Sequence, residues 1–205
     1  MIERTRRLSD RVIRALVHKE LGAINVTAID EARIFSSVVD VFAPVSLHAF
    51  EIKSEADDLR RLQRQALVAE RTLPIVTLVT TETHLTHARE LIGPWWGLWV
   101  AHQGANGIQL DQVRRATEHN QLSVTWVLGA LHGPELRNIA RANGLPTSGS
   151  LHEVVTRLIR RIGERECIRL GHTLLSTPAR WSKTDNIWTR PILAAQGVAL
   201  FPLPV

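Results

Sequence analysis

Three polar residues near the middle of the sequence have types and a spacing that could do chemistry. Asp40 lies in the segment VVDVF, and Glu51 and Lys53 lie in the segment LHAFEIK. Alternate residues of a strand point to the same face, so Glu51 and Lys53 share a face if their segment is a strand. If the two segments form a hairpin, Asp40 can lie beside Glu51.

Two adjacent carboxylates repel each other unless a cation lies between them, and oxygen ligands suit Mg²⁺ or Mn²⁺ better than zinc. We therefore expect a magnesium or manganese ion held by Asp40, Glu51 and the backbone carbonyl of Ile52. The ion would polarise a phosphoryl oxygen and orient a water molecule, while Lys53 would stabilise the transition state of phosphodiester hydrolysis. The alternative is that the three side chains form an ordinary exposed polar face of an antiparallel pair.

The elements that must position these residues follow from the hydrophobic pattern. Apolar residues at helical spacing indicate amphipathic helices, and β-branched runs indicate strands. Ser54 and Asp57 match a capping box, which places the start of a helix there. In chain order we predict a helix at 9–21, strands at 25–35, 38–42 and 47–53, a helix from 54 to about 70, a buried parallel strand at 73–81, a helix at about 82–92 and a strand over WWGLWVA.

Strand signals fade after about residue 110, and the patterns from DQVRRATEH onward are typical of short helices separated by Gly, Pro or Ser. We place a domain boundary between residues 105 and 120. The predicted domains are 1–105, which carries the polar motif, and 106–205, which is helical. The apolar, Pro-rich tail from Pro191 is expected to pack on the body or on a partner.

The order of these elements and the motif residues resemble the PD-(D/E)xK superfamily, which has the restriction-endonuclease-like fold. The segment LHAFEIKSEADDLRRLQRQ at 47–65 and the later PWWG are similar to a poorly characterised bacterial and phage group of that superfamily, over about residues 25–100. The resemblance implies an α/β fold class, with a mixed sheet flanked by helices and a small α-helical C-terminal domain. It also implies a nuclease domain at 1–105.

The resemblance further implies an additional acid near the metal. Glu31, nine residues before Asp40, is the preferred candidate, and Glu20 is the other. Some relatives place a Q-x-x-x-Y pattern on the helix after the motif strand, but here Gln65 is followed by Ala69 and the chain has no Tyr. This departure weakens any role of Gln65.

Arginines follow the motif and recur near the C-terminus. Arg60, Arg61 and Arg64, with Gln65, would lie on the helix after the motif strand, where they could contact phosphates or form a solvated face. The segment LRNIARANGLPTSGSLHEVVTRLIRRI at 136–162 resembles a SAP-like helix-extended-helix module, a type associated with DNA binding. A helical cap and a dimer interface are the alternatives for this segment.

The amino-acid composition limits the classes of protein and partner that these motifs can indicate. The chain has 205 residues, 44% of them hydrophobic and 22% charged, which is typical of a packed globular protein. A formal net charge of +5 is compatible with a polyanionic partner. The lone Cys167 cannot form an internal disulfide, and no apolar run is long enough for a signal peptide or a membrane span, so we expect a cytoplasmic protein without a membrane partner.

Together these patterns predict a divalent-metal-dependent nuclease that hydrolyses DNA phosphodiesters, in defence, repair or mobile-element biology. The expected cofactor is Mg²⁺ or Mn²⁺ and the expected partner is nucleic acid, preferably DNA. A non-catalytic nucleic-acid-binding or protein-interaction module on the same fold is the alternative, and an RNA nuclease is the third. The sequence leaves homo-oligomer formation open.

Overall fold

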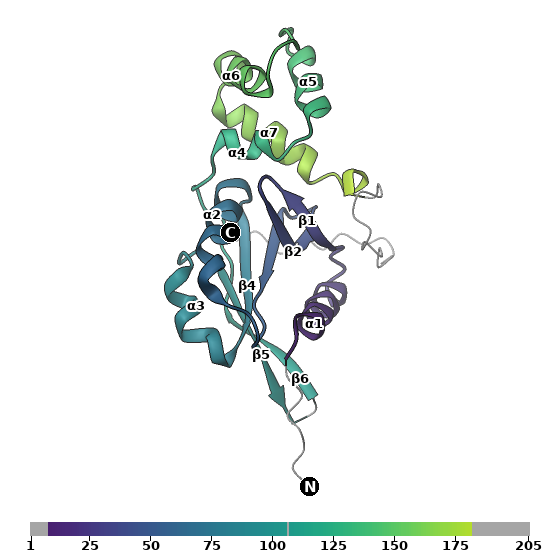
Figure 1. The fold of residues 1–205 in the computed structure, drawn as a ribbon. Helices are drawn as coiled ribbons and strands as arrows, with labels where there is room; N and C mark the ends of the chain where they lie inside the picture. The colour runs from purple at the N-terminus through teal and green to yellow at the C-terminus, as the bar shows by residue number, and fades with distance from the viewer. Residues whose placement is uncertain (1–7, 106, 182–205) are drawn as a thin grey trace.

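The computed structural model describes residues 8–105 and 107–181, which form a mixed α/β fold (Figure 1). A six-stranded sheet has the spatial order β1-β2-β3-β4-β5-β6. Its strands are β1 (Ile29–Ile34), β2 (Ser37–Ala43), β3 (His48–Ile52), β4 (Ile75–Thr81), β5 (Gly97–Gly104) and β6 (Gly107–Arg114). The helices are α1 (Asp10–Ala23), α2 (Leu62–Thr72), α3 (Leu85–Leu91), α4 (Val124–Gly129), α5 (Gly133–Ala142), α6 (Leu151–Ile162) and α7 (Glu164–Leu175), with 3₁₀ turns η1 (Leu59–Arg61), η2 (Glu82–His84) and η3 (Pro178–Trp181).

The direction of the strands changes along the sheet. Strands β1, β2 and β3 form an antiparallel meander, β3, β4 and β5 run parallel, and β6 returns antiparallel to β5. Helices α2 and α3 provide the two crossovers that parallel neighbours require. The predicted α/β class, with a mixed sheet and a C-terminal group of helices, is therefore confirmed.

Helices cover both faces of the sheet. Ile13, Val17 and Leu21 of α1 pack with Phe50 and other side chains on one face. Helices α2 and α3 lie on the opposite face (Figure 1), where their apolar residues join a second and larger core. Because β3 lies in the middle of this sandwich, all five of its residues are buried.

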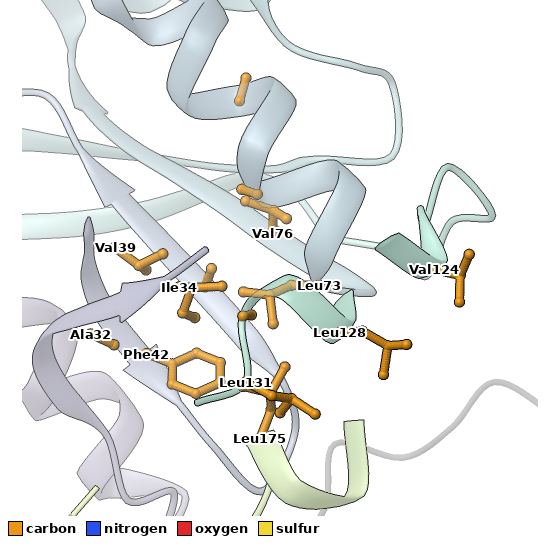
Figure 2. Close-up of a cluster of buried hydrophobic side chains, with 14 of the residues drawn as sticks. Ala32, Ile34, Val39, Phe42, Leu73, Val76, Val124, Leu128, Leu131 and Leu175 are labelled. Carbon is orange, nitrogen blue, oxygen red and sulfur yellow. The ribbon is translucent and has the colours of Figure 1, made fainter. Parts of the chain in front are cut away.

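The larger core continues from the sheet into the C-terminal helices. Figure 2 shows Phe42 of β2 beside Leu131 and Leu175 from the helical segment. Phe35, in the β1–β2 turn, stacks on Trp126 of α4 with ring centroids 4.9 Å apart. Helices α4–α7 are thus joined to the sheet by one continuous apolar cluster. Among the described residues, none of the helices has the length and apolar character needed to cross a membrane.

The start of α2 differs from the prediction. The backbone N–H and the hydroxyl of Ser54 both donate to Asp57 Oδ2, at 2.8 and 2.6 Å, but this contact closes a turn and does not begin a helix. Helical structure begins after Asp58, which accepts a hydrogen bond from the N–H of Arg60 at 2.8 Å. The predicted helix start at Ser54 is therefore wrong, and the cap is Asp58, whose carboxylate also suits a helix start.

The segment DQVRRATEH also differs from the prediction, which made it helical. Residues up to Arg114 instead form β6, whose pairing with β5 begins at the tight connection between Gly104 and Gly107. Gly107 has a φ of +108°, a conformation that favours glycine. The sheet therefore continues past the boundary drawn at residue 105, and the tail from Pro191 lies outside the described residues.

The shared core leads to a first prediction. Leu128→Ala removes a fully buried side chain and should lower the free energy of unfolding by about 2–5 kcal/mol. Unfolding should remain a single transition, because the sheet and the helices share this core. Urea unfolding followed by tryptophan fluorescence and by circular dichroism measures both quantities. The control Leu67→Ala, at a 46% exposed position, should change stability by less than about 0.5 kcal/mol; two separate transitions would contradict the shared core.

Candidate functional site: a buried ion cluster

The strand pairing brings Asp40, Glu51 and Lys53 together. Val41 of β2 pairs with Phe50 of β3 in antiparallel register, so Asp40 lies opposite Glu51, and directly opposite residues share a face. Glu51 and Lys53 are nearly inaccessible, with 5% and 6% of their surface exposed. The predicted exposed polar face is therefore absent, and these charges are buried.

Hydrogen bonds hold the three residues in place. Lys53 Nζ donates to Glu51 Oε1 at 2.6 Å, and the N–H of Ile52 donates to Asp40 Oδ2 at 2.7 Å. The backbone of Lys53 continues the parallel pairing, since its N–H donates to the carbonyl of Val79 at 2.8 Å. The side chain of Lys53 is thus fixed beside Glu51 at the end of β3.

Burial changes the proton affinity of both carboxylates. Loss of water raises the pKa of Glu51 to about 7, the charge of Asp40 adds to this effect, and the ammonium of Lys53 opposes it. Burial also raises the pKa of Asp40, against the stabilising effects of the Ile52 N–H and of the positive charges of Lys53 and Arg14. At neutral pH, therefore, Glu51 can hold or release a proton.

Helix α1 supplies a second part of the cluster, which the sequence analysis missed. Arg14 donates to the backbone carbonyl of Asp40 at 2.5 Å and lies 3.4 Å from its Oδ1. The same guanidinium pairs with Asp10 at 3.1 Å and with Asp30 at 3.6 Å. His18 Nε2 lies 2.7 Å from Asp30. The available signal was Arg14 itself, which interrupts an apolar helix face four residues after Asp10.

These residues fit a magnesium or manganese ion poorly. Each carboxylate already faces a cationic side chain, Lys53 for Glu51 and Arg14 for Asp40, so the charge that a metal would supply is present. Within residues 8–105 and 107–181 no group of three or more His, Cys, Asp or Glu could hold a metal ion. The contacts of these residues form an ion cluster that joins α1 to β1, β2 and β3, and the metal ion predicted on Asp40, Glu51 and the carbonyl of Ile52 stays a prediction.

Glu31 lies across from Asp40 but in an unusual conformation. The β1–β2 register pairs the residues on either side, Asp30 with Val41 and Ala32 with Val39, so Glu31 is the residue opposite Asp40. Its φ of +53° is rare for a non-glycine residue, and its side chain is exposed. Glu31 is thus near the cluster in register, and its predicted role as an additional acid stays a prediction.

The predicted nucleic-acid contacts separate into two groups. Arg60 is 89% exposed, pairs with Asp58 and lines a hollow that is also bounded by η2 and α3. Arg61, Arg64 and Gln65 instead line a cleft between α2 and the β1–β2 turn. These four residues do not form one surface, and neither hollow includes Asp40, Glu51 or Lys53.

Comparison with known protein families matches residues 6–190 to the family described as Bacteriophage P4 protein cII. No curated protein and no solved structure matches the chain. The match covers most of the sequence, and it replaces the resemblance to PD-(D/E)xK nucleases. The predicted nuclease superfamily, the predicted hydrolysis of DNA and the RNA-nuclease alternative are therefore wrong.

The raised pKa of Glu51 predicts a pH-dependent stability. The folded state binds the Glu51 proton more tightly than the unfolded chain, so this contribution is present below about pH 4.5 and is lost as the pH rises through about 7. The free energy of unfolding of wild type, relative to that of Glu51→Gln, should therefore fall by on the order of 3 kcal/mol between pH 4.5 and pH 8. Urea unfolding of both proteins at several pH values measures this difference.

The comparison with Glu51→Gln is needed because histidines also titrate in this range. Burial lowers the pKa of His119 and of His172, which makes stability rise with pH and masks the effect of Glu51 in wild type alone. Glu90→Gln, at an exposed position, is the matched control and should reproduce the wild-type pH profile. A difference between wild type and Glu51→Gln that does not change with pH would contradict the assignment.

Proposed function

The chain belongs to the bacteriophage P4 protein cII family, and from that premise we propose that it is a DNA-binding protein whose contact surface is the turn between α6 and α7. The observation that carries this proposal is a group of exposed arginines at that turn with no acidic partner among the described residues. The group consists of Arg160, Arg161 and Arg165.

Positive charge is unevenly distributed along the chain. Residues 124–181 contain eight Arg and four Asp or Glu, whereas residues 8–123 contain twelve Lys or Arg and fourteen Asp or Glu. The C-terminal helices are therefore cationic, and the segment that contains the sheet is slightly anionic. A polyanion would be attracted to the helical end of the molecule.

The three arginines lie close together in the chain and point away from the core. Arg160 and Arg161 occupy the last turn of α6, Gly163 makes the connection with a φ of +82°, and Arg165 lies in the first turn of α7. All three are exposed, and within residues 8–105 and 107–181 they form no ion pair, unlike Arg169, which pairs with Glu166 at 2.6 Å. Their guanidinium groups are available for phosphates.

The framework behind the arginines is fixed. Arg157 donates to the carbonyls of Pro146 and Ser148 at 3.1 and 2.8 Å, and Arg137 donates to the carbonyls of Thr147 and Gly149. These two arginines hold the extended connection between α5 and α6, so they are structural. A rigid helix-extended-helix unit can present its remaining arginines at low conformational cost.

The same helix can pack and bind. Val154, Val155 and Leu158 of α6 are buried in the larger core, and Arg160 and Arg161 lie on the solvent side. The capping role that the sequence left as an alternative is therefore compatible with DNA binding, because Arg160 lies on the face of α6 opposite the buried residues and Arg161 is exposed in the last turn of the helix. The dipole of α6 also favours arginines at its C-terminal end, which is a sufficient structural reason for two cations there but not for Arg165 on the next helix.

The proposal predicts a specific change in DNA affinity. Arg160→Ala combined with Arg161→Ala should weaken binding of the full chain to a 20-base-pair duplex at least about tenfold at low salt. The slope of log K against log salt should fall by about 1.8, because two phosphate contacts no longer release counterions. Fluorescence anisotropy at several salt concentrations measures both values.

The control variant removes the same charge elsewhere. Arg11→Ala combined with Arg89→Ala changes exposed positions on α1 and α3 and should leave the affinity and the slope close to those of wild type. A duplex RNA of the same sequence tests whether DNA is preferred. Absence of DNA binding by wild type, or equal loss in both double variants, would overturn the proposal.

A further inference from the structure

A second cationic feature lies far along the sequence from the α6–α7 turn. A cleft of about 270 Å³ separates the β1–β2 turn from α2. Ser36, Ser37 and Val38 form one wall, and Arg61, Arg64 and Gln65 line the other. It is built entirely from the segment that contains the sheet, and it is separate from the buried ion cluster.

The positive charge of this cleft is offset only in part by the surrounding described residues, because Asp58 interacts with Arg61 through space but forms its ion pair with Arg60. Arg61 and Arg64 are exposed and have no carboxylate within 4 Å in the described part of the chain. The neighbouring Arg60 differs, because it pairs with Asp58 and lines the other hollow. Two guanidinium groups without an acidic partner on one wall favour an anion in the cleft.

Hydrogen-bonding groups in the cleft are also available. Gln65 Oε1 is buried, and among the described residues it has no donor. A buried acceptor without a donor costs free energy, so a ligand that supplies an N–H or O–H group there would be favoured. The hydroxyls of Ser36 and Ser37 make no hydrogen bond to the described residues and lie on the facing wall.

The cleft has an apolar component and rigid walls. Val38 is 38% exposed at its rim, and Val68 lies behind it. The β1–β2 turn is held by the stacking of Phe35 on Trp126, and a Cβ at Gly129 would lie 2.6 Å from the Phe35 ring, so the turn packs closely on α4. A ligand would therefore meet a wall that is already formed.

We propose that this cleft binds one nucleotide unit, with its phosphate between Arg61 and Arg64 and a hydroxyl or amino group of its sugar or base donating to Gln65. The space of the cleft suits a single nucleotide, and Val38 offers an apolar edge to the sugar or base. The unit can be a free nucleotide or the phosphorylated end of a nucleic-acid strand. This inference does not depend on DNA binding by the α6–α7 turn.

The test is isothermal titration of the full chain with defined probes. The probes are a nucleoside 5′-monophosphate, the corresponding nucleoside, inorganic phosphate, and a four-nucleotide strand with either a 5′-phosphate or a 5′-hydroxyl. We expect a phosphorylated nucleotide, free or as the strand end, to bind at least tenfold more tightly than its unphosphorylated counterpart. Inorganic phosphate should bind more weakly, because it offers nothing to Val38.

The variants Arg64→Gln and Arg61→Gln should each reduce the affinity for the phosphorylated nucleotide about tenfold or more. Gln65→Glu should reduce this affinity more than either of them, because it places a negative charge beside the phosphate. Arg60→Gln is the matched control, since it removes the same charge one residue away from the cleft and should leave the affinity unchanged. Thermal melting checks that all four variants fold.

The outcomes separate the two sources and the two proposals. Binding of the monophosphate indicates a free nucleotide, and binding of the 5′-phosphorylated strand alone indicates a strand end; both support the cleft. No binding by either probe, or equal effects of Arg60→Gln and Arg64→Gln, overturns it. The paired change of Arg160 and Arg161 should leave monophosphate affinity unchanged, so failure of one proposal is distinguishable from failure of the other.

Discussion

A charged carboxylate is costly to bury unless a cation accompanies it, and this constraint organises the middle of the molecule. Glu51 lies at the end of the fully buried strand β3, where a carboxylate has little access to water. Lys53, two residues later, points to the same side and neutralises it at 2.6 Å. Asp40 on the neighbouring strand is a second carboxylate that needs a nearby positive charge, and Arg14 from α1 provides it. With Asp30 of β1, which also pairs with Arg14, the ion cluster ties one helix and three strands together at the point where the meander becomes a parallel sheet.

A second constraint links this cluster to the surface. The β1–β2 hairpin supplies Asp30 and Asp40 to the cluster, Phe42 to the larger core, and its turn to the contact with α4. The same hairpin forms one wall of the arginine cleft. Its position is thus determined from both ends, by ion pairs at one end and by aromatic stacking at the other. Groups presented by such an element lose little conformational freedom when they bind a ligand.

The sequence predicted the parts of this arrangement that depend on local pattern. Period-two alternation and β-branched runs placed strands β1 to β5, and the pairing of β2 with β3 correctly brought Asp40 beside Glu51. Strand β6 was missed because its sequence favours a helix and only pairing with β5 makes it a strand. The roles of Arg14 and Asp30 were missed because they depend on how α1 lies against the sheet. Arg60 and Arg61 were grouped, although the 3₁₀ turn before α2 directs them into different hollows.

The nuclease prediction was wrong for a related physical reason. An acid and a lysine two residues apart on a strand share a face, and their long side chains can reach ion-pair distance whether or not a metal is bound. A second acid on the neighbouring strand then needs its own cation, and Arg14 provides one. The same D…E-x-K spacing thus satisfies the requirements of a buried structural cluster as well as those of a metal centre. The residue types and spacing of this motif alone do not identify a function. The arginines of the α6–α7 turn and of the α2 cleft are a more direct basis for the two proposals of ligand binding, because exposed cations without an ion-pair partner contribute little to folding.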